Sequence, residues 1–176
     1  MKNKIFLTGN PGIGKTTIIV KSIDGIKSAG GFYTREIRES GERVGFEIVT
    51  LITGKTGILA HRDFNTIYRV GKYGVNVEVF ENLIDVEMEE ALKRANLIVI
   101  DEIGRMELYS EKFKKMINKI LESDFKILGV IQKKQKEFIK RVRRLKDAQI
   151  FEVSPENREK ILSYVKEWIR NIFNIV

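Results

Sequence analysis

The chain of 176 residues contains no cysteine, which excludes a disulfide-bonded scaffold, a thiolate zinc site and a cysteine nucleophile. Its single histidine, His61, cannot form a histidine metal cluster, and we expect it in a turn. No apolar run approaches the roughly 20 residues that a membrane-spanning helix needs. No signal-peptide pattern opens the chain. We therefore expect a cytoplasmic protein without a membrane partner.

The sequence also lacks a proline- or serine-rich linker, a repeat and a low-complexity tract. Hydrophobic residues make up 43% of the chain, and a chain of this length buries roughly 70% of its unfolded surface. We therefore expect residues 1–176 to form one domain, and the protein to be a monomer. The formal net charge of +8 favours polyanionic partners such as nucleotides or RNA, or serves solubility alone. Abundant Lys, Glu and Ile resemble heat-adapted compositions.

Segments with strand and helix patterns alternate along the chain. We predict strands at residues 4–8, 77–79, 97–100, 126–131 and 149–153, and helices at residues 15–29, 85–95, 111–122, 134–145 and 154–173. Short apolar strands between helices are typical of parallel sheets covered on both faces, so this order predicts an α/β fold. Three β-rich segments after the first helix indicate an inserted meander. They lie at residues 31–38, 45–52 and 57–60.

A phosphate-binding loop is predicted near the start of the chain. Its sequence is Gly9-Asn10-Pro11-Gly12-Ile13-Gly14-Lys15-Thr16, which fits the Walker A pattern G-x-x-x-x-G-K-[ST]. Glycines let successive N–H groups point at an anion, and the following helix N-terminus adds partial positive charge. We expect Lys15 to reach the β- and γ-phosphates, Thr16 to bind Mg²⁺ and Thr17 to contact the α-phosphate. A second Gly-Lys-Thr at residues 54–56 precedes a strand, so we predict a hairpin turn there.

Two acids, Asp101 and Glu102, follow the apolar strand predicted at residues 97–100. The carboxyl ends of neighbouring parallel strands open onto one crevice. If this strand neighbours the strand at residues 4–8, Asp101 faces the Mg²⁺ held by Thr16 and binds it mainly through its water shell. Glu102 then projects towards the γ-phosphate, where a carboxylate can act as the general base for an attacking water.

Three arginines are candidates for stabilising charge on the γ-phosphate. Arg105 follows the acidic strand end closely and could act as an arginine supplied in cis. The alternative for Arg105 is an ion pair with Glu107 or Glu102. Arg35 and Arg38, in the β-rich insertion, are its rivals.

A basic segment at residues 133–146 could bind nucleic acid or cover the phosphates as a lid. The spacing of Phe138, Val142 and Leu145 indicates one buried face and a solvated basic face. No aromatic residues are interleaved on the basic face to stack on bases, which weakens the RNA interpretation. Just before this segment, Gln132 could sense the γ-phosphate or hold the water; the alternative is an exposed strand end.

Four further stretches carry a resemblance to a known family. They are Gly31-Phe32-Tyr33-Thr34-Arg35-Glu36-Ile37-Arg38, Arg43-Val44-Gly45-Phe46-Glu47-Ile48-Val49, Val70-Gly71-Lys72-Tyr73-Gly74-Val75 and Asp101-Glu102-Ile103-Gly104-Arg105-Met106-Glu107-Leu108. With the loop, they resemble the thermophile and cancer-related P-loop nucleoside-triphosphatase family over nearly the whole chain. The resemblance implies a RecA-like, three-layer fold with a mostly parallel sheet. It also implies slow, Mg²⁺-dependent hydrolysis of ATP, GTP and other nucleoside triphosphates.

Hydrolysis is the leading functional interpretation, and two alternatives stay open. A nucleotide or small-molecule kinase could use the same loop, with residues 31–60 and 133–146 supplying an acceptor pocket and a lid. A nucleotide-switched RNA-binding protein would explain the positive charge. The chain has no Asn-Lys-x-Asp guanine signature, so GTP is not favoured over ATP.

Overall fold

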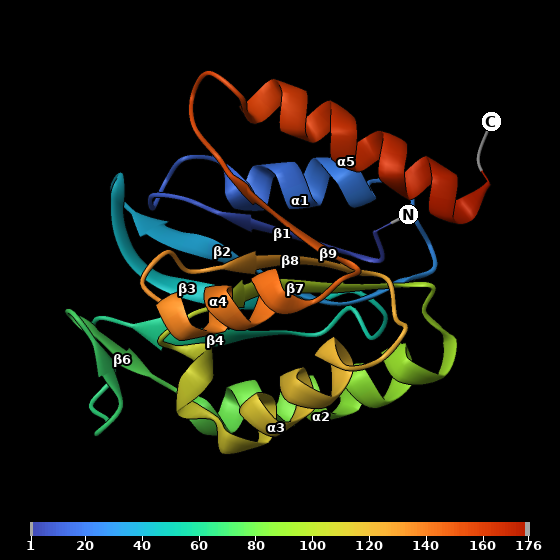
Figure 1. The fold of residues 1–176 in the computed structure, drawn as a ribbon. Coiled ribbons are helices and arrows are strands. Elements are labelled where there is room, and N and C mark those ends of the chain that lie inside the picture. Colours follow the sequence, from blue (N-terminus) through green and yellow to red (C-terminus); the bar gives the residue numbers. More distant parts are fainter. Residues whose placement is uncertain (1, 175–176) are drawn as a thin grey trace.

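The computed structural model describes residues 2–174 of the chain. In chain order the elements are β1 (Lys4–Thr8), α1 (Lys15–Ile23), β2 (Ala29–Glu39), β3 (Glu42–Thr50), β4 (Thr56–His61), β5 (Arg69–Val70), β6 (Tyr73–Val75), α2 (Val77–Arg94), β7 (Leu97–Ile103), the 3₁₀ turn η1 (Glu107–Tyr109), α3 (Glu111–Leu121), β8 (Ile127–Ile131), α4 (Lys136–Arg144), β9 (Ala148–Glu152) and α5 (Arg158–Phe173). The strands form one sheet in the order β5-β6-β4-β3-β2-β7-β8-β1-β9. Figure 1 shows this sheet between helices α1 and α5 above and helices α2 and α3 below.

One half of the sheet is parallel. Strands β2, β7, β8, β1 and β9 run side by side in the same direction. Every residue of β1 and β8 is buried, because each has a strand on both sides and helices above and below. This double burial is why these strands consist mainly of apolar residues rather than alternating with polar ones.

The other half of the sheet is antiparallel, so the expectation of a mostly parallel sheet is wrong. Of the eight strand pairings within residues 2–174, four are parallel and four are antiparallel. Short turns cause this, because a chain that reverses within a few residues pairs with its own preceding strand. Gly41 and Gly54, with φ of +83° and +64°, sit in the two turns that join β2 to β3 and β3 to β4. The hairpin predicted at residues 54–56 is therefore present.

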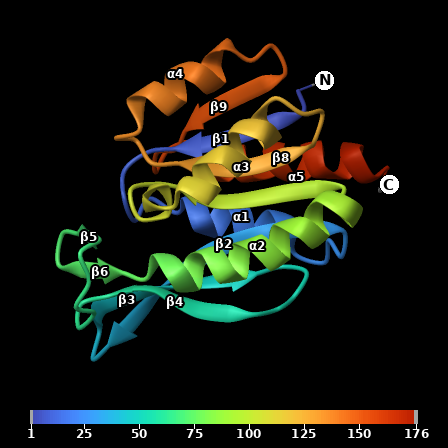
Figure 2. The same ribbon diagram turned by 90° about the horizontal axis from the view of Figure 1, so that it is seen from below.

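Helices cover both faces of the sheet, as an α/β fold requires. Helices α2, α3 and α4 pack on one face around a cluster that includes Phe32, Phe80 and Phe113. Helices α1 and α5 pack on the other face around Ile19, Val165 and Trp168. In Figure 2 the layer of α2, α3 and α4 faces the viewer, and α1 and α5 lie behind the sheet.

Predicted and observed bounds differ most in three helices. The last helix begins as α5 at Arg158 rather than at residue 154. Helix α1 ends at Ile23 rather than residue 29, because Asp24 leaves the helical conformation with a ψ of 125° and Gly25 has a positive φ of +77°. The expected strand at residues 77–79 is instead the first turn of α2. The Asn76 side chain caps this helix by accepting the Val79 N–H at 3.0 Å. The cap and the buried spacing of Phe80, Ile84, Met88 and Ala91 outweigh the β-propensity of two valines.

The strand order places β8 between β1 and β7. Strand β1, which precedes the phosphate loop, and strand β7, which carries the acidic pair, are therefore not neighbours. The prediction that Asp101 faces the Mg²⁺ held by Thr16 assumes that they are. All three strands are parallel, so their carboxyl ends still reach the same edge of the sheet. Within residues 2–174, no helix is both long and apolar enough to cross a membrane.

Candidate active site

The loop between β1 and α1 forms the centre of the site. Its glycines Gly9, Gly12 and Gly14 adopt φ of +140°, +75° and +103°, which side chains with a Cβ rarely tolerate. In the described chain, no side chain caps the N-terminus of α1. The first N–H groups of a helix have no partner within the helix, so this end offers amide donors and partial positive charge to an anion.

Lys15, the first residue of α1, folds back over this loop. Its ammonium donates to the carbonyl oxygens of Gly9 at 3.1 Å and of Asn10 at 2.8 Å. Burial lowers the pKa of Lys15, and the negative charges of Glu102 and Asp101 partly offset this effect. Both acids therefore stabilise the charge of the ammonium in part, while its hydrogen-bond partners are neutral carbonyls that a phosphate can replace.

Asp101 lies near the carboxyl end of β7, with only 1% of its surface exposed. Among residues 2–174, its Oδ2 atom has no hydrogen-bond partner. Burial raises its pKa to about 7, and Glu102 adds to this; a hydrogen bond with the Thr16 side chain and the charge of Lys15 act in the opposite direction. The structure thus brings Asp101 next to Thr16 and Lys15, with one buried carboxylate oxygen available to a ligand.

Glu102 shares its surroundings with another acid, Glu107. A Cβ atom on Gly104 would lie 2.8 Å from the Glu102 Oε1 and 2.9 Å from the Glu107 Oε2, so the two carboxylates flank the same glycine. Burial raises the pKa of Glu102, which Lys15 partly counteracts. Burial and the neighbouring Glu102 raise the pKa of Glu107 well above its usual value. Asp101 and Glu107, which are buried, and Glu102, which is partly buried, therefore form an acidic cluster.

Arg105 is exposed and makes no ion pair within the described part of the chain, so the alternative pairing with Glu107 or Glu102 is absent there. Its backbone N–H donates to the Gln132 side-chain Oε1 at 3.1 Å, which ties the ends of β7 and β8 together. Arg35 and Arg38 are engaged elsewhere. Arg35 pairs with Glu47 at 2.5 Å, and Arg38 with Glu36 at 2.6 Å.

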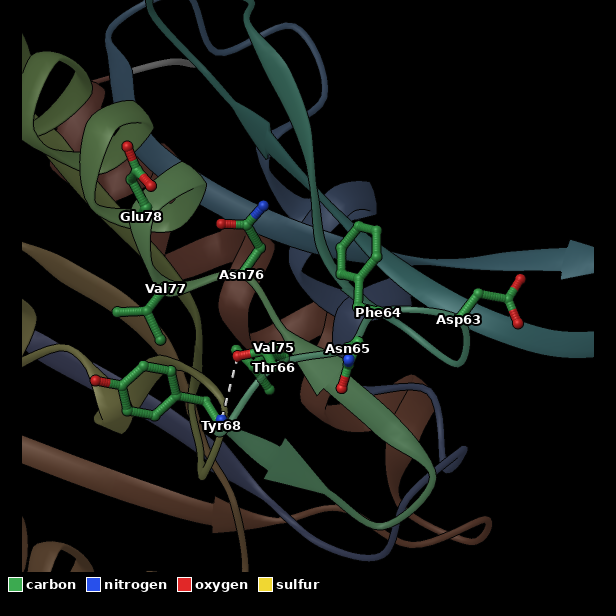
Figure 3. Close-up of a pocket in the computed structure, with 9 residues that line it drawn as sticks. All are labelled: Asp63, Phe64, Asn65, Thr66, Tyr68, Val75, Asn76, Val77 and Glu78. Atoms are coloured by element: carbon green, nitrogen blue, oxygen red, sulfur yellow. Dashed lines mark hydrogen bonds between the residues drawn. The ribbon is translucent and has the colours of Figure 1, made fainter.

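A cavity of about 460 Å³ lies between α2 and residues 63–68, and no residue of the phosphate loop lines it (Figure 3). Its two carboxylates, Asp63 and Glu78, lie on opposite sides of the group and point away from each other. The Asn76 side-chain oxygen is already used to cap α2. This cavity also lies outside residues 31–60 and 133–146, from which a kinase would take its acceptor pocket and lid.

Comparison with known proteins places the chain in a family. Residues 4–166 match a family model described as NTPase. The chain belongs to the NTPase family. The nucleoside-triphosphatase THEP1 of Thermotoga petrophila is 46% identical over 162 residues, which span 92% of this chain and 90% of the relative. THEP1 of Methanocaldococcus jannaschii is 38% identical over 167 residues, which span 92% and 94%.

Two solved structures of similar proteins share the fold. The crystal structure of THEP1 from the hyperthermophile Aquifex aeolicus has a TM-score of 0.84 and 38% identity, covering 94% of this chain and 98% of that chain. The solution structure of a human cancer-related nucleoside triphosphatase has a TM-score of 0.78 and 34% identity, covering 96% and 98%. The family resemblance carried by the sequence motifs is therefore confirmed.

Glu107 belongs to the site of this NTPase-family protein, but its sequence does not predict that role. In the sequence, Glu107 is only a possible partner for Arg105. In the structure it is 3% exposed, within η1 and beside Glu102. The available signal is that Met106 and Leu108 flank it, since an acid between two apolar residues close to an acidic strand end is a candidate for burial.

Proposed function

We propose that the protein hydrolyses nucleoside triphosphates to the diphosphate and phosphate in a Mg²⁺-dependent reaction. Water attacks in line with the γ-phosphate and is activated by Glu102. The observation that supports this most is the grouping of buried Lys15 and Asp101 with partly buried Glu102, beside a helix N-terminus that no side chain of residues 2–174 caps. The order β7-β8-β1-β9, with the loop after β1, is consistent with a RecA-like P-loop scaffold.

The proposed phosphate contacts lie in the loop and the first turn of α1. They are Gly9, Asn10, Pro11, Gly12, Ile13, Gly14, Lys15, Thr16 and Thr17. Their backbone N–H groups, which all of these residues except Pro11 possess, would donate to the phosphate oxygens. Lys15 would exchange its two carbonyl partners for the β- and γ-phosphates. Thr17, which is exposed on α1, would contact the α-phosphate.

Thr16 and Asp101 would hold the metal. The fit rests on chemistry, since Mg²⁺ prefers oxygen ligands and usually keeps several waters. The Oδ2 of Asp101, which has no hydrogen-bond partner within residues 2–174, is such an oxygen, buried within reach of the Thr16 side chain. When bound, Mg²⁺ neutralises charge that develops on the phosphates.

Glu102 would orient the water and take its proton. A general base works best with a pKa near the working pH, and burial moves the pKa of Glu102 upward in that direction. Arg105 is placed just beyond Glu102, exposed and without an ion-pair partner among the described residues, so its guanidinium is available to the γ-phosphate. Catalysis would then depend mainly on positioning and charge stabilisation, as in other phosphoryl transfers.

The test is phosphate release from ATP and Mg²⁺ with no added acceptor. We expect steady release by the wild-type protein and none above background with EDTA. Consumption of ATP only in the presence of a nucleoside or sugar would replace hydrolysis by a kinase activity. Gln149→Ala, in β9 away from the loop, is the control and should match the wild type.

A further inference from the structure

A smaller cavity of about 200 Å³ lies between α1 and the first turns of α5, directly beside the phosphate loop. These two helices pack side by side on one face of the sheet (Figure 1). The cavity is smaller than the roughly 300–1,000 Å³ of sites for drug-sized ligands. Its size therefore suits a single flat ring system rather than a large ligand.

The cavity is continuous with the proposed triphosphate site. Gly14 and Thr17 line it, and both also belong to the loop and the first turn of α1. Thr17 is the residue proposed to contact the α-phosphate, which is the phosphate that carries the nucleoside. A triphosphate bound along the loop would therefore direct its nucleoside towards this cavity.

The lining of the cavity combines an apolar floor with a charged rim. Ile18 is buried and Leu162 partly buried, so they form the floor, whereas Lys21, Arg158 and Glu159 are exposed and form the rim. The Arg158 side chain is 54% exposed, and its Nε atom lies 3.8 Å from the Glu159 Oε1, which is a loose contact. A guanidinium group held this loosely is free to lie flat against an aromatic ring, a geometry that arginine favours and lysine does not offer.

We propose that this cavity is the nucleoside subsite, in which the base lies on Ile18 and Leu162 and Arg158 stacks on its outer face. The inference rests on the proposed function, because the triphosphate must first occupy the loop. It makes Arg158 a residue that binds the nucleoside and takes no part in cleavage.

Inorganic tripolyphosphate separates this subsite from the phosphate loop, because it carries the three phosphates without a nucleoside. The experiment measures the Kd of Mg²⁺–ATP and of Mg²⁺–tripolyphosphate by calorimetry for the wild type, Arg158→Ala, Arg158→Lys and Arg170→Ala. Arg170 is an exposed residue near the other end of α5 and serves as the matched control.

We expect wild-type protein to bind ATP more tightly than tripolyphosphate. Arg158→Ala should weaken ATP binding roughly 3- to 10-fold, the usual scale for a stacked cation, and leave tripolyphosphate binding within twofold. Arg158→Lys should resemble the alanine variant, since lysine keeps the charge and loses the plane. Arg170→Ala should match the wild type for both ligands.

Three kinds of result would overturn the proposal that this cavity binds the nucleoside. Equal loss of affinity for both ligands in Arg158→Ala, with rescue of both affinities in Arg158→Lys, would show that Arg158 attracts phosphate charge. Unchanged ATP binding in Arg158→Ala, or equal wild-type affinity for the two ligands, would place the nucleoside elsewhere. A wild-type protein that binds neither ligand would instead refute the phosphate loop, and with it the proposed function.

Discussion

Replacing Asp101 by Asn should make the ligand-free protein more stable at alkaline pH while removing a proposed metal ligand. The carboxylate is buried and its Oδ2 has no partner among the described residues, so without a bound metal its charge is destabilising, and Lys15 offsets only part of this. An isosteric amide carries no charge. The expected gain in stability follows from the pKa of Asp101, which burial raises from 3.8 to about 7.

The direction in which the free energy of unfolding changes with pH follows from proton binding by Asp101. Between about pH 4 and pH 7 the folded protein keeps the Asp101 proton that the unfolded chain has already lost, so this group stabilises the fold at acidic pH. That stability is lost as the pH rises through about 7. Two pH units separate pH 7 from pH 5, so the wild type should lose about 3 kcal/mol from this group between pH 5 and pH 8. Asp101→Asn should not lose it.

Urea unfolding at pH 5 and pH 8, in EDTA and without nucleotide, measures this difference. We expect Asp101→Asn to gain about 3 kcal/mol relative to the wild type on going from pH 5 to pH 8. Thermal melting should show the same trend, at roughly 2–4 °C per kcal/mol for a chain of this size. The other buried acids are present in both proteins, so their titration largely cancels in the comparison.

Glu87→Gln is the matched control, because Glu87 is also a fully buried carboxylate. Its oxygens accept the N–H groups of Gly31, Ile52 and Thr53, each at 2.9 Å, and the Thr53 hydroxyl at 3.0 Å. An amide there turns an N–H group towards a donor, and leaving buried donors unpaired costs roughly 1–3 kcal/mol each. Glu87→Gln should therefore destabilise the protein. Destabilisation of Asp101→Asn at pH 8, by a similar amount, would refute the interpretation of Asp101 as a destabilising charge.

Three further changes test the site and its surroundings. Lys15→Ala should weaken Mg²⁺–ATP binding and slow phosphate release together, measured by calorimetry and a phosphate assay; unchanged binding would contradict the role of Lys15. Gly104→Ala places a Cβ 2.8 Å from the Glu102 Oε1 and 2.9 Å from the Glu107 Oε2, so the two carboxylates must shift. Turnover should then fall by roughly 10- to 100-fold, with the circular dichroism spectrum preserved. Normal turnover would show that the acidic cluster tolerates this displacement. Any affinity of the exposed basic face of α4 for RNA should fall steeply with salt and drop in Arg143→Glu/Arg144→Glu; an affinity indifferent to ionic strength would exclude this face.

The sequence predicts the local features of the site well. The order of strand, glycine loop and helix is encoded within about a dozen consecutive residues, and β1 matches its predicted range of residues 4–8. Asp101 and Glu102 stand out because an apolar strand precedes them. Both acids lie within β7 rather than after it, because the strand extends to Ile103.

Features that depend on distant parts of the chain are not predictable in the same way. The insertion of β8 between β1 and β7 is set by how the connecting helices pack on the sheet, which no local pattern encodes. The burial of Glu107 is set by the tertiary packing of the turn after β7, where its carboxylate lies beside Gly104 and Glu102. The antiparallel half of the sheet is partly visible in the turns at Gly41 and Gly54, but its continuation into β6 and β5 is not.

The most direct measurement compares nucleotide binding and single-turnover phosphate release in Glu102→Gln. The amide keeps the shape of Glu102 and cannot accept a proton. We predict Mg²⁺–ATP binding close to that of the wild type and release slowed by roughly 100-fold or more, the usual scale for loss of a general base. Release at the wild-type rate, with binding intact, would contradict water activation by Glu102.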